Sequence, residues 1–403
     1  MKGTRICTRH GNGNLKFVAL LAALLLCLLP GELTAQDRPP GTSARPITAP
    51  IDVDVPVPPV PFQGDEEFHL AYELHISNLG KSDCTLTKIA VVGNQSDSRR
   101  IANFTEDDLA EMIVHPGQNP AAKTKIGPGS FAVVYMWVTS ARRESIPSAI
   151  RHRISMKVDG YSEEITVETP PTPVAEGKPI VIDPPLTGGE WQAGNGPSNK
   201  SIHRRALIPI DGRVYISQRF AIDWVQLYPD GKTYKGDPAG NRNYRDYGAE
   251  IHAVADGVVT QVKDGIPQNT PTAKTLAVPI TLETVGGNHV IEEIEGGVYA
   301  FYAHMQTGSV RVKVGDKVNR GEVLGLLGNS GNSSEPHLHF HICNANSELG
   351  CEGLPYAFPS YEIQGKGEGW KLSESSGAPK KEERAIPLED DVVRFPAFPQ
   401  KNP

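Results

Sequence analysis

Residues 336–341 read Pro336-His337-Leu338-His339-Phe340-His341. In a β-strand alternate residues share a face, so the three imidazoles would project from one side while Leu338 and Phe340 pack on the other. Neutral imidazoles are costly to bury together unless a partner uses their lone pairs, and zinc is a common partner of clustered histidines. The pattern therefore predicts a strand that carries a metal site. A solvated cluster, or one satisfied within the core, is the alternative.

The composition favours a β-rich protein of two or three domains. The chain has 403 residues, among them 40 Gly and 34 Pro, which indicates many turns and argues against a helix bundle. Its formal net charge of −7 leaves no basic footprint for nucleic acid, so that class of partner is not expected.

The N-terminus has the order of a secretory signal peptide. Four basic residues precede an apolar run over 17–29, and Leu33-Thr34-Ala35 offers a cleavage site before Gln36. The run is short for a membrane span, although an uncleaved anchor is the alternative. We expect residues 1–35 to be removed, no membrane span to remain, and the mature protein to be periplasmic, extracellular or associated with the cell wall.

Three cysteines remain after the signal. Cys343 and Cys351 flank a turn-rich loop, and an oxidising compartment would favour a disulfide between them. Cys84 would then be a free, buried thiol. Three unpaired thiols are the alternative.

Proline-rich stretches divide the chain. The expected parts are a linker over 36–62, a β-sandwich accessory domain over 63–170, a linker over 171–186, a second domain over 187–362 and a disordered tail over 363–403. Residues 68–77 alternate strictly between apolar and polar, which is typical of a half-buried strand. Further short strands at regular spacing predict a sandwich of immunoglobulin-like type, with a short helix over 105–112. No catalytic constellation is found in this part.

The second domain holds the residues that carry chemistry. Asp223 interrupts an apolar, strand-like run and needs a partner there. Residues 248–259 have a strand–turn–strand pattern with Asp-Gly at the turn, and residues 299–304 form a strand that ends on His304. A glycine-rich segment over 314–331 then leads to the histidine cluster.

Residues 248–341 resemble the lysostaphin-type (LytM-type) zinc peptidases, a family of murein hydrolases. The matching pieces are Ala-Val-Ala-Asp-Gly-Val over 253–258, Tyr302-Ala303-His304, the Gly-Asp-Lys-Val segment and the Gly-Asn-Ser-Gly loop before His337 and His339. The resemblance implies a β-sheet domain with a barrel-sandwich hybrid motif and one zinc ion that activates water. It makes Asp223 and His339 metal ligands, and His304 and His337 catalytic imidazoles.

One departure from the family concerns Arg219, which stands four residues before Asp223 where the family has its first ligand, a histidine. A guanidinium has no lone pair to offer a metal. In one interpretation His341 or His203 completes the site. In a second, Arg219 pairs with Asp223, zinc is absent, and the domain binds peptidoglycan or regulates a partner hydrolase. In a third, Arg219 stabilises a transition-state anion beside a weakly held metal.

Two further features are open. Tyr302 is either a packing residue or an aromatic wall for substrate, and the polar segment over 224–247 either lines the groove or is a neutral surface insertion. The leading hypothesis is an exported zinc endopeptidase that acts on peptide cross-links of bacterial peptidoglycan. The alternatives are a catalytically inactive binder and a general protease for exported proteins.

Overall fold

The computed structural model describes residues 48–94, 100–367 and 379–396. The expected signal peptide over 1–35 lies outside these residues. Among the described residues, no helix has the length and hydrophobicity that a bilayer crossing requires. The described chain is mostly β, as expected, and it forms a sandwich followed by a second, larger sheet.

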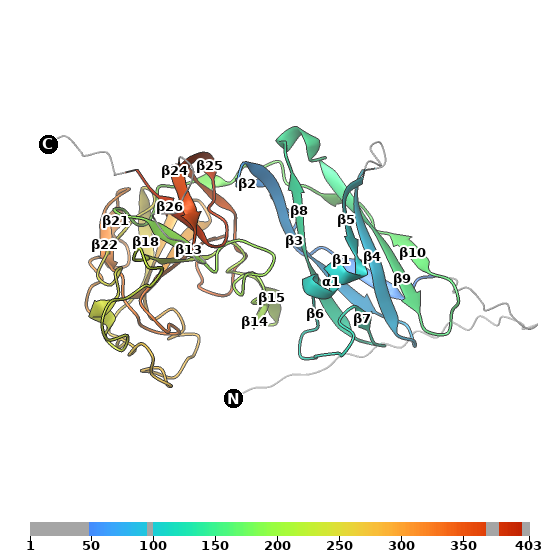
Figure 1. Cartoon of the computed structure of the whole chain (residues 1–403), viewed down its shortest axis with the longest axis horizontal. Coiled ribbons are helices and arrows are strands. Elements are labelled where there is room, and N and C mark those ends of the chain that lie inside the picture. The colour runs from blue at the N-terminus through green and yellow to red at the C-terminus, as the bar shows by residue number, and fades with distance from the viewer. Residues whose placement is uncertain (1–47, 95–99, 368–378, 397–403) are drawn as a thin grey trace, which may run out of the picture. The chain divides into compact units, whose positions relative to one another are not determined.

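The first part is a sandwich of two antiparallel sheets (Figure 1). One sheet has the order β1-β3-β8-β6, with β2 beside β3, and the other has the order β10-β9-β4-β5, with β11 beside β9 and β7 beside β4. The strands are β1 (Ile51–Asp54), β2 (Phe62–Gly64), β3 (Glu67–Asn78), β4 (Cys84–Gly93), β5 (Arg100–Thr105), β6 (Ile113–Val114), β7 (Lys125–Ile126), β8 (Phe131–Ser140), β9 (Ala149–Val158), β10 (Ile165–Glu168) and β11 (Thr172–Pro173). The apolar residues that alternate along β3 and β4 meet in one core between the sheets, as the period-2 pattern predicts.

A short helix, α1 (Glu106–Met112), joins β5 to β6. Thr105 is its N-cap: the Thr105 side chain accepts from the backbone N–H of Asp108, and the Asp108 carboxylate accepts from the backbone N–H of Thr105. This reciprocal capping box satisfies two donors that the first turn leaves open. Leu109 and Met112 face the core, so the helix closes one edge of the sandwich. A single 3-10 turn, η1 (Arg143–Ser145), follows β8.

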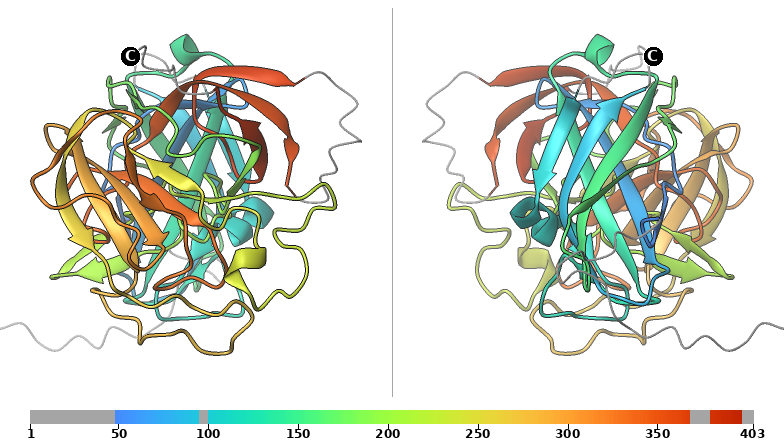
Figure 2. Two further views of the ribbon diagram at one scale, coloured as in Figure 1. Left: turned by 90° about the vertical axis from the view of Figure 1, so that its left-hand side faces the viewer. Right: turned by 90° about the vertical axis from the view of Figure 1, so that its right-hand side faces the viewer.

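The second part is built on a large, mostly antiparallel sheet, of which Figure 2 (left) shows the yellow and orange strands side by side. Its order is β12-β24-β26-β13-β16-β23-β20-β19-β18-β21, with β25 beside β24; β14 pairs with β15, and β17 with β22. The elements are β12 (Ile180–Val181), β13 (Trp191–Gly194), β14 (Ile208–Ile210), β15 (Arg213–Tyr215), β16 (Ile222–Val225), η2 (Asn241–Asn243), β17 (Glu250–His252), β18 (Gly257–Lys263), β19 (Asn288–Glu295), β20 (Val298–Met305), β21 (Lys317–Val318), β22 (Val323–Leu326), β23 (Leu338–Cys343), β24 (Tyr356–Lys366), β25 (Lys380–Ala385) and β26 (Asp391–Arg394). No closed barrel is found among the described residues.

The structure corrects the limits expected for the linkers and the tail. The segment 36–62 contains β1 and the start of β2, and the segment 171–186 contains β11 and β12. Each of these strands pairs with a neighbouring strand, so these parts of the expected linkers belong to the sheets. Four of the eight prolines of the first segment lie between its two strands, where they mark a connection. β25 and β26 lie in the supposed tail 363–403, where β26 is paired on both sides by β24 and β13. A four-residue strand is too short to show a periodicity in the sequence.

A buried carboxylate on β3 connects the sandwich to the segment that precedes β16. Glu73 is 3% exposed, and its Oε2 lies 3.0 Å from Nη2 of Arg219 while its Oε1 lies 3.4 Å from Nη2 of Arg204. Burial alone would raise the pKa of Glu73, but the two arginines lower it below its usual value. Arg204 also donates to the backbone carbonyls of Tyr72 and Met136. The charges are therefore paired within the core.

We expect Glu73→Ala to lower the free energy of unfolding by about 3–5 kcal/mol, because it leaves buried guanidinium groups without their shared counter-charge. The measurement is denaturant unfolding followed by tryptophan fluorescence. Glu67→Ala is the matched control, since Glu67 is exposed at the start of the same strand and its loss should cost less than about 0.5 kcal/mol. Equal effects of the two substitutions would contradict a structural role for the network.

Candidate metal centre

The centre begins with the register between β16 and β23. These strands are antiparallel, and Asp223 is the direct partner of His339. Nδ1 of His339 lies 2.9 Å from Oδ1 of Asp223. The neighbours of Asp223 on β16, Ile222 and Trp224, are fully buried in the core. Alternation along the strand thus turns the carboxylate toward the imidazole while its neighbours pack on the opposite face.

His203 joins this pair from a turn at 202–205. Its Nε2 lies 3.3 Å from Oδ2 of Asp223, and its Nδ1 lies 3.1 Å from the backbone oxygen of Asn195, to which an Nδ1–H donates. The Asn195 side chain donates to the same Oδ2 of Asp223 at 2.8 Å. The ligand atoms of His203, Asp223 and His339 all lie within 4.8 Å of one another. Asn195 was missed by the sequence analysis, because no motif marks it.

His341 lies behind His339 and does not reach Asp223. Its Nδ1 is 3.0 Å from Nε2 of His339, the ring nitrogen that faces away from the carboxylate, and its side chain is fully buried. If His339 binds a metal through Nδ1, its hydrogen sits on Nε2, and Nδ1 of His341 is placed to accept it. The expectation that His341 is itself a ligand beside Asp223 is therefore corrected: the shared strand face brings it to His339 instead.

His304 and His337 stand next to each other at the same centre, with ring centroids 4.7 Å apart. Nδ1 of His304 is 2.8 Å from the backbone oxygen of Ser330, and Nδ1 of His337 is 2.9 Å from that of Glu335. Nε2 of His337 lies 3.5 Å from Oδ1 of Asp223. Each imidazole is thus held through one nitrogen, which leaves Nε2 as the nitrogen available for chemistry.

The backbone at His304 is unusual. Its φ of +62° lies in the left-handed region that non-glycine residues rarely adopt, and the β19–β20 ladder is irregular at this point. An irregularity of this kind re-aims a side chain, and such features are common beside active sites. The backbone N–H of His304 donates to the carbonyl of Gly286, which holds the strained conformation in place.

Burial and neighbouring charges determine the protonation of the centre. Burial lowers the pKa of His339 to about 4 and holds the pKa of His304 well below its usual value. Burial would raise the pKa of Asp223, but the imidazoles of His203 and His337 bring it well below its usual range. At neutral pH the carboxylate is therefore ionised, and His339 and His304 are neutral and keep their lone pairs.

These side chains line a cavity of about 280 Å³. Its wall includes Asp223, the imidazoles of His203, His304, His337 and His339, and the side chains of Phe301 and Glu348. None of the residues that line it comes from the segment 224–247, so the structure does not support a groove-lining role for that segment. Thr233 of this segment instead contacts Glu335, with its hydroxyl 3.2 Å from Oε2.

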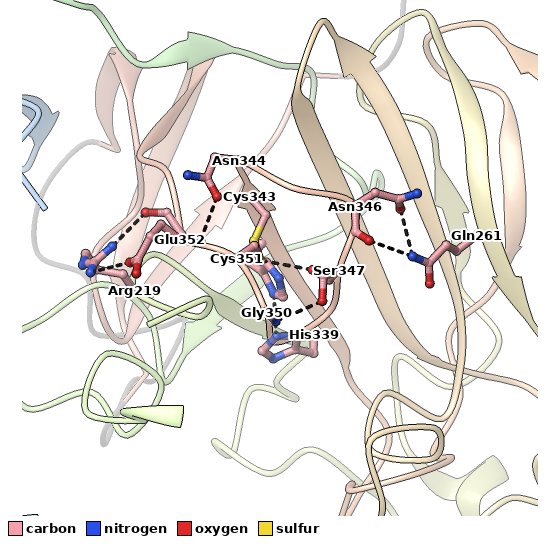
Figure 3. The surroundings of a disulfide bond; sticks show 12 residues. Arg219, Gln261, His339, Cys343, Asn344, Asn346, Ser347, Gly350, Cys351 and Glu352 are labelled. Carbon is pink, nitrogen blue, oxygen red and sulfur yellow. Dashed lines mark hydrogen bonds and ion pairs between the residues drawn. A yellow bond between two sulfur atoms is a disulfide. The ribbon is translucent and has the colours of Figure 1, made fainter. Parts of the chain in front are cut away.

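Arg219 points away from the centre. Its guanidinium donates to Glu73, to the carbonyl of Gly353, and to Oε2 of Glu352 at 2.8 Å, the pair drawn in Figure 3. It is not among the residues that line the cavity. The structure thus contradicts both a pairing of Arg219 with Asp223 and a role for Arg219 in stabilising an anion. The buried carboxylate of Glu73 and the half-buried carboxylate of Glu352 already satisfy its charge.

Tyr302 is also removed from the substrate side. Its ring is fully buried in the core, its hydroxyl donates to Oε2 of Glu292 at 2.5 Å, and it accepts from the backbone N–H of Val254. Tyr302 is therefore a packing residue, and the expectation of an aromatic substrate wall at this position is corrected. The neighbouring Phe301, on the other face of β20, is the aromatic residue that lines the cavity.

The expected disulfide is present. Cys343 and Cys351 are bonded, with their Cα atoms 6.0 Å apart, and Cys84 is a buried free thiol, as predicted. The bond ties the end of β23 to the loop that follows (Figure 3).

Comparison with known proteins assigns a segment of the second part to a family. Residues 244–350 match the model of peptidase family M23. This chain carries a peptidase family M23 domain. The match confirms the resemblance drawn from residues 248–341. It begins after Asp223, so the segment that supplies His203, Arg219 and Asp223 lies outside the matched residues.

Relatives with known names match parts of this chain. Endolysin 2638A of Staphylococcus phage 2638A is 32% identical over 164 residues, which are 36% of this chain and 33% of that protein. Glycyl-glycine endopeptidase ALE-1 of Staphylococcus capitis is 30% identical over 118 residues, 29% of this chain and 30% of the relative. The chain thus spans about a third of the length of these relatives. The catalytic domain of lysostaphin from Staphylococcus simulans matches at 25% identity over 29% of this chain and 80% of that domain, with a TM-score of 0.18.

Proposed function

We propose that this protein is an exported zinc endopeptidase that hydrolyses peptide cross-links of bacterial peptidoglycan. The observation that carries the proposal is the convergence of His203, Asp223 and His339 on one point, with His304 and His337 beside them. The M23 domain and relatives named as endopeptidases support the reaction class. A relative from Vibrio cholerae named as a peptidoglycan DD-endopeptidase supports the substrate class; it is 28% identical over 155 residues, 38% of this chain and 30% of that protein.

The residues fit a zinc ion. Two imidazoles and one carboxylate are a set of ligands found in catalytic zinc sites, which keep a further position open. The nitrogen of each ligand imidazole that faces away from the metal position also has a partner: the carbonyl of Asn195 for His203, and the ring of His341 for His339. Such outer partners fix the tautomer and the ring orientation of a metal-binding histidine.

His203 therefore takes the place of the ligand that Arg219 cannot supply. The guanidinium is committed to Glu73 and Glu352, and the turn at 202–205 brings an imidazole to the carboxylate from a different direction. His341 becomes an outer partner of His339. In this proposal the departure at position 219 is compensated within the chain, and the site keeps three protein ligands.

The remaining imidazoles perform proton chemistry. Zinc, when bound, lowers the pKa of water and polarises a peptide carbonyl. His304 is neutral at physiological pH, so its Nε2 can accept a proton and later return it to the leaving amine. His337 lies on the Asp223 side of the cavity. Because its Nδ1–H donates to the Glu335 carbonyl, its Nε2 can donate only as an imidazolium, and in that form it can stabilise the oxygen on which negative charge develops. The carbonyls of Ser330 and Glu335 hold both rings in position.

The first test is metal retention. We expect the protein to bind about one zinc per chain, and we expect His203→Ala to weaken zinc binding more than about 100-fold, beyond the usual cost of losing an outer partner. Zinc content by elemental analysis and competition with a chelator measure this. His341→Ala should cost about 10–100-fold. His75→Ala, on the sandwich strand β3, is the control and should change nothing.

Two results would contradict the ligand assignment. Full retention of zinc by His203→Ala together with its loss from His341→Ala would give the third position to His341. No zinc in the unaltered protein, even after its addition, would leave only the second hypothesis, a peptidase-like domain that binds peptidoglycan without cleaving it. That hypothesis assumed that Arg219 pairs with Asp223, whereas its guanidinium donates to Glu73, Gly353 and Glu352.

The second test is activity on purified peptidoglycan. We expect zinc-dependent release of new amino groups. We also expect His304→Ala and His337→Ala each to lower the rate about 10²–10⁴-fold while zinc stays bound, because the first removes a proton-transfer group and the second removes a donor to the developing negative charge. A chelator should abolish the reaction and added zinc should restore it. Casein as a parallel substrate separates this activity from that of a general protease. Binding to peptidoglycan without release of amino groups would contradict the proposal that the protein is an endopeptidase.

A further inference from the structure

The cavity holds a second carboxylate that the metal centre does not use. Asp223 and Glu348 are the two carboxylate residues of its lining, and Asp223 is engaged by the imidazoles and Asn195. Among the described residues, nothing forms a hydrogen bond or an ion pair with the side chain of Glu348. Burial raises its pKa to about 8, and no nearby charge offsets that effect. An unpaired carboxylate in a desolvated position is stabilised by a cation.

The loop that carries Glu348 is anchored at several points. It lies between Cys343 and Cys351, and the disulfide closes it. In the middle of this loop Asn346 is anchored to β18: its backbone oxygen and its side-chain oxygen accept from Nε2 of Gln261 at 2.9 and 3.0 Å (Figure 3). Ser347 accepts from the backbone N–H of Gly350 and tightens the turn. The backbone that carries the carboxylate is therefore positioned before any ligand arrives, which lowers the entropic cost of binding.

An aromatic ring stands beside this carboxylate. A Cβ placed on Gly286 would lie 2.7 Å from Oε1 of Glu348 and 2.8 Å from Cζ of Phe301, so the two side chains meet over this glycine. Gly286 also accepts from the backbone N–H of His304. The carboxylate and the ring thus lie next to a catalytic position, and together they form the kind of pocket that recognises an ammonium group.

We propose that Glu348, with Phe301 beside it, forms a subsite for a primary ammonium group of the peptide substrate. This inference rests on the proposed function, since it places the ammonium group near the bond to be cleaved. Two parts of a cross-linked peptide supply that chemistry: the side chain of a diamino acid residue and a free amino terminus. Glu348 also lines a second cavity, of about 310 Å³.

The test uses synthetic cross-bridge peptides with four arms: lysine or norleucine at one position, each with a free or an acetylated amino terminus. We expect kcat/KM of the zinc-loaded protein to be about tenfold or more higher for peptides with the recognised ammonium group. Glu348→Gln, which keeps the shape of the side chain, should remove this preference through KM. A preference for lysine identifies a side-chain ammonium, and a preference for the free terminus identifies the α-amino group.

Glu283→Gln is the matched control, because Glu283 is an exposed carboxylate on the wall of the neighbouring cavity. It should leave the preference unchanged. Lysine and norleucine peptides cleaved equally well, whether or not their terminus is free, would overturn the subsite, as would a preference that survives in Glu348→Gln.

Calorimetric binding of the same peptides separates the two proposals. If no peptide is cleaved but the ammonium peptides bind about tenfold more tightly, and Glu348→Gln abolishes the difference, the subsite holds and the proposed reaction fails. If cleavage occurs without any ammonium preference in rate or binding, the reaction holds and the subsite fails. Phe301→Leu gives an independent check: it should weaken the preference without abolishing it, because the carboxylate remains.

Discussion

The centre depends on one register, the antiparallel pairing that sets Asp223 opposite His339. Ile222 and Trp224 flank the carboxylate, and Leu338 and Phe340 flank the imidazole; all four are fully buried. A slip by one residue would turn the carboxylate into the apolar core and expose the tryptophan, at a cost that the surrounding packing forbids. The hydrophobic effect on one face of the sheet therefore fixes the polar geometry on the other face.

Local pattern was enough to predict the elements that build this geometry. The alternation over 68–77 corresponds to β3 and the 105–112 helix to α1. The last two histidines of the triplet lie on β23, whose apolar face is in the core, and His337 lies just before this strand. The disulfide was also predictable, since eight residues of turn-rich chain separate its cysteines. In each case the physical cause acts over a few residues, so the local sequence is enough to predict it. The cause is the side-chain period for the strands and the helix, and the closure of a short loop for the disulfide.

The remaining features come from contacts between distant parts of the chain. Glu73 and Arg219 are 146 residues apart, and Arg204 and Glu73 are 131 apart, so no spacing rule connects them. The same holds for Asn195 and for the approach of His203 to Asp223. The roles considered for Arg219 beside Asp223 were wrong because proximity in sequence was taken for proximity in space: on β16 and the turn before it, the two side chains leave in different directions.

Because Arg219 points away from Asp223, the charged side chains of this region form two separate groups. Arg204 and Arg219 are balanced by Glu73 and Glu352, so that cluster is electrically complete. Asp223 is left with imidazoles, of which His339 is neutral at physiological pH, and the pKa of His203 is raised because the effect of Asp223 outweighs that of burial. A buried carboxylate among histidines has a charge that only protons or a cation can balance. Because Arg219 pairs with Glu73 and not with Asp223, the position beside Asp223 stays open to a metal.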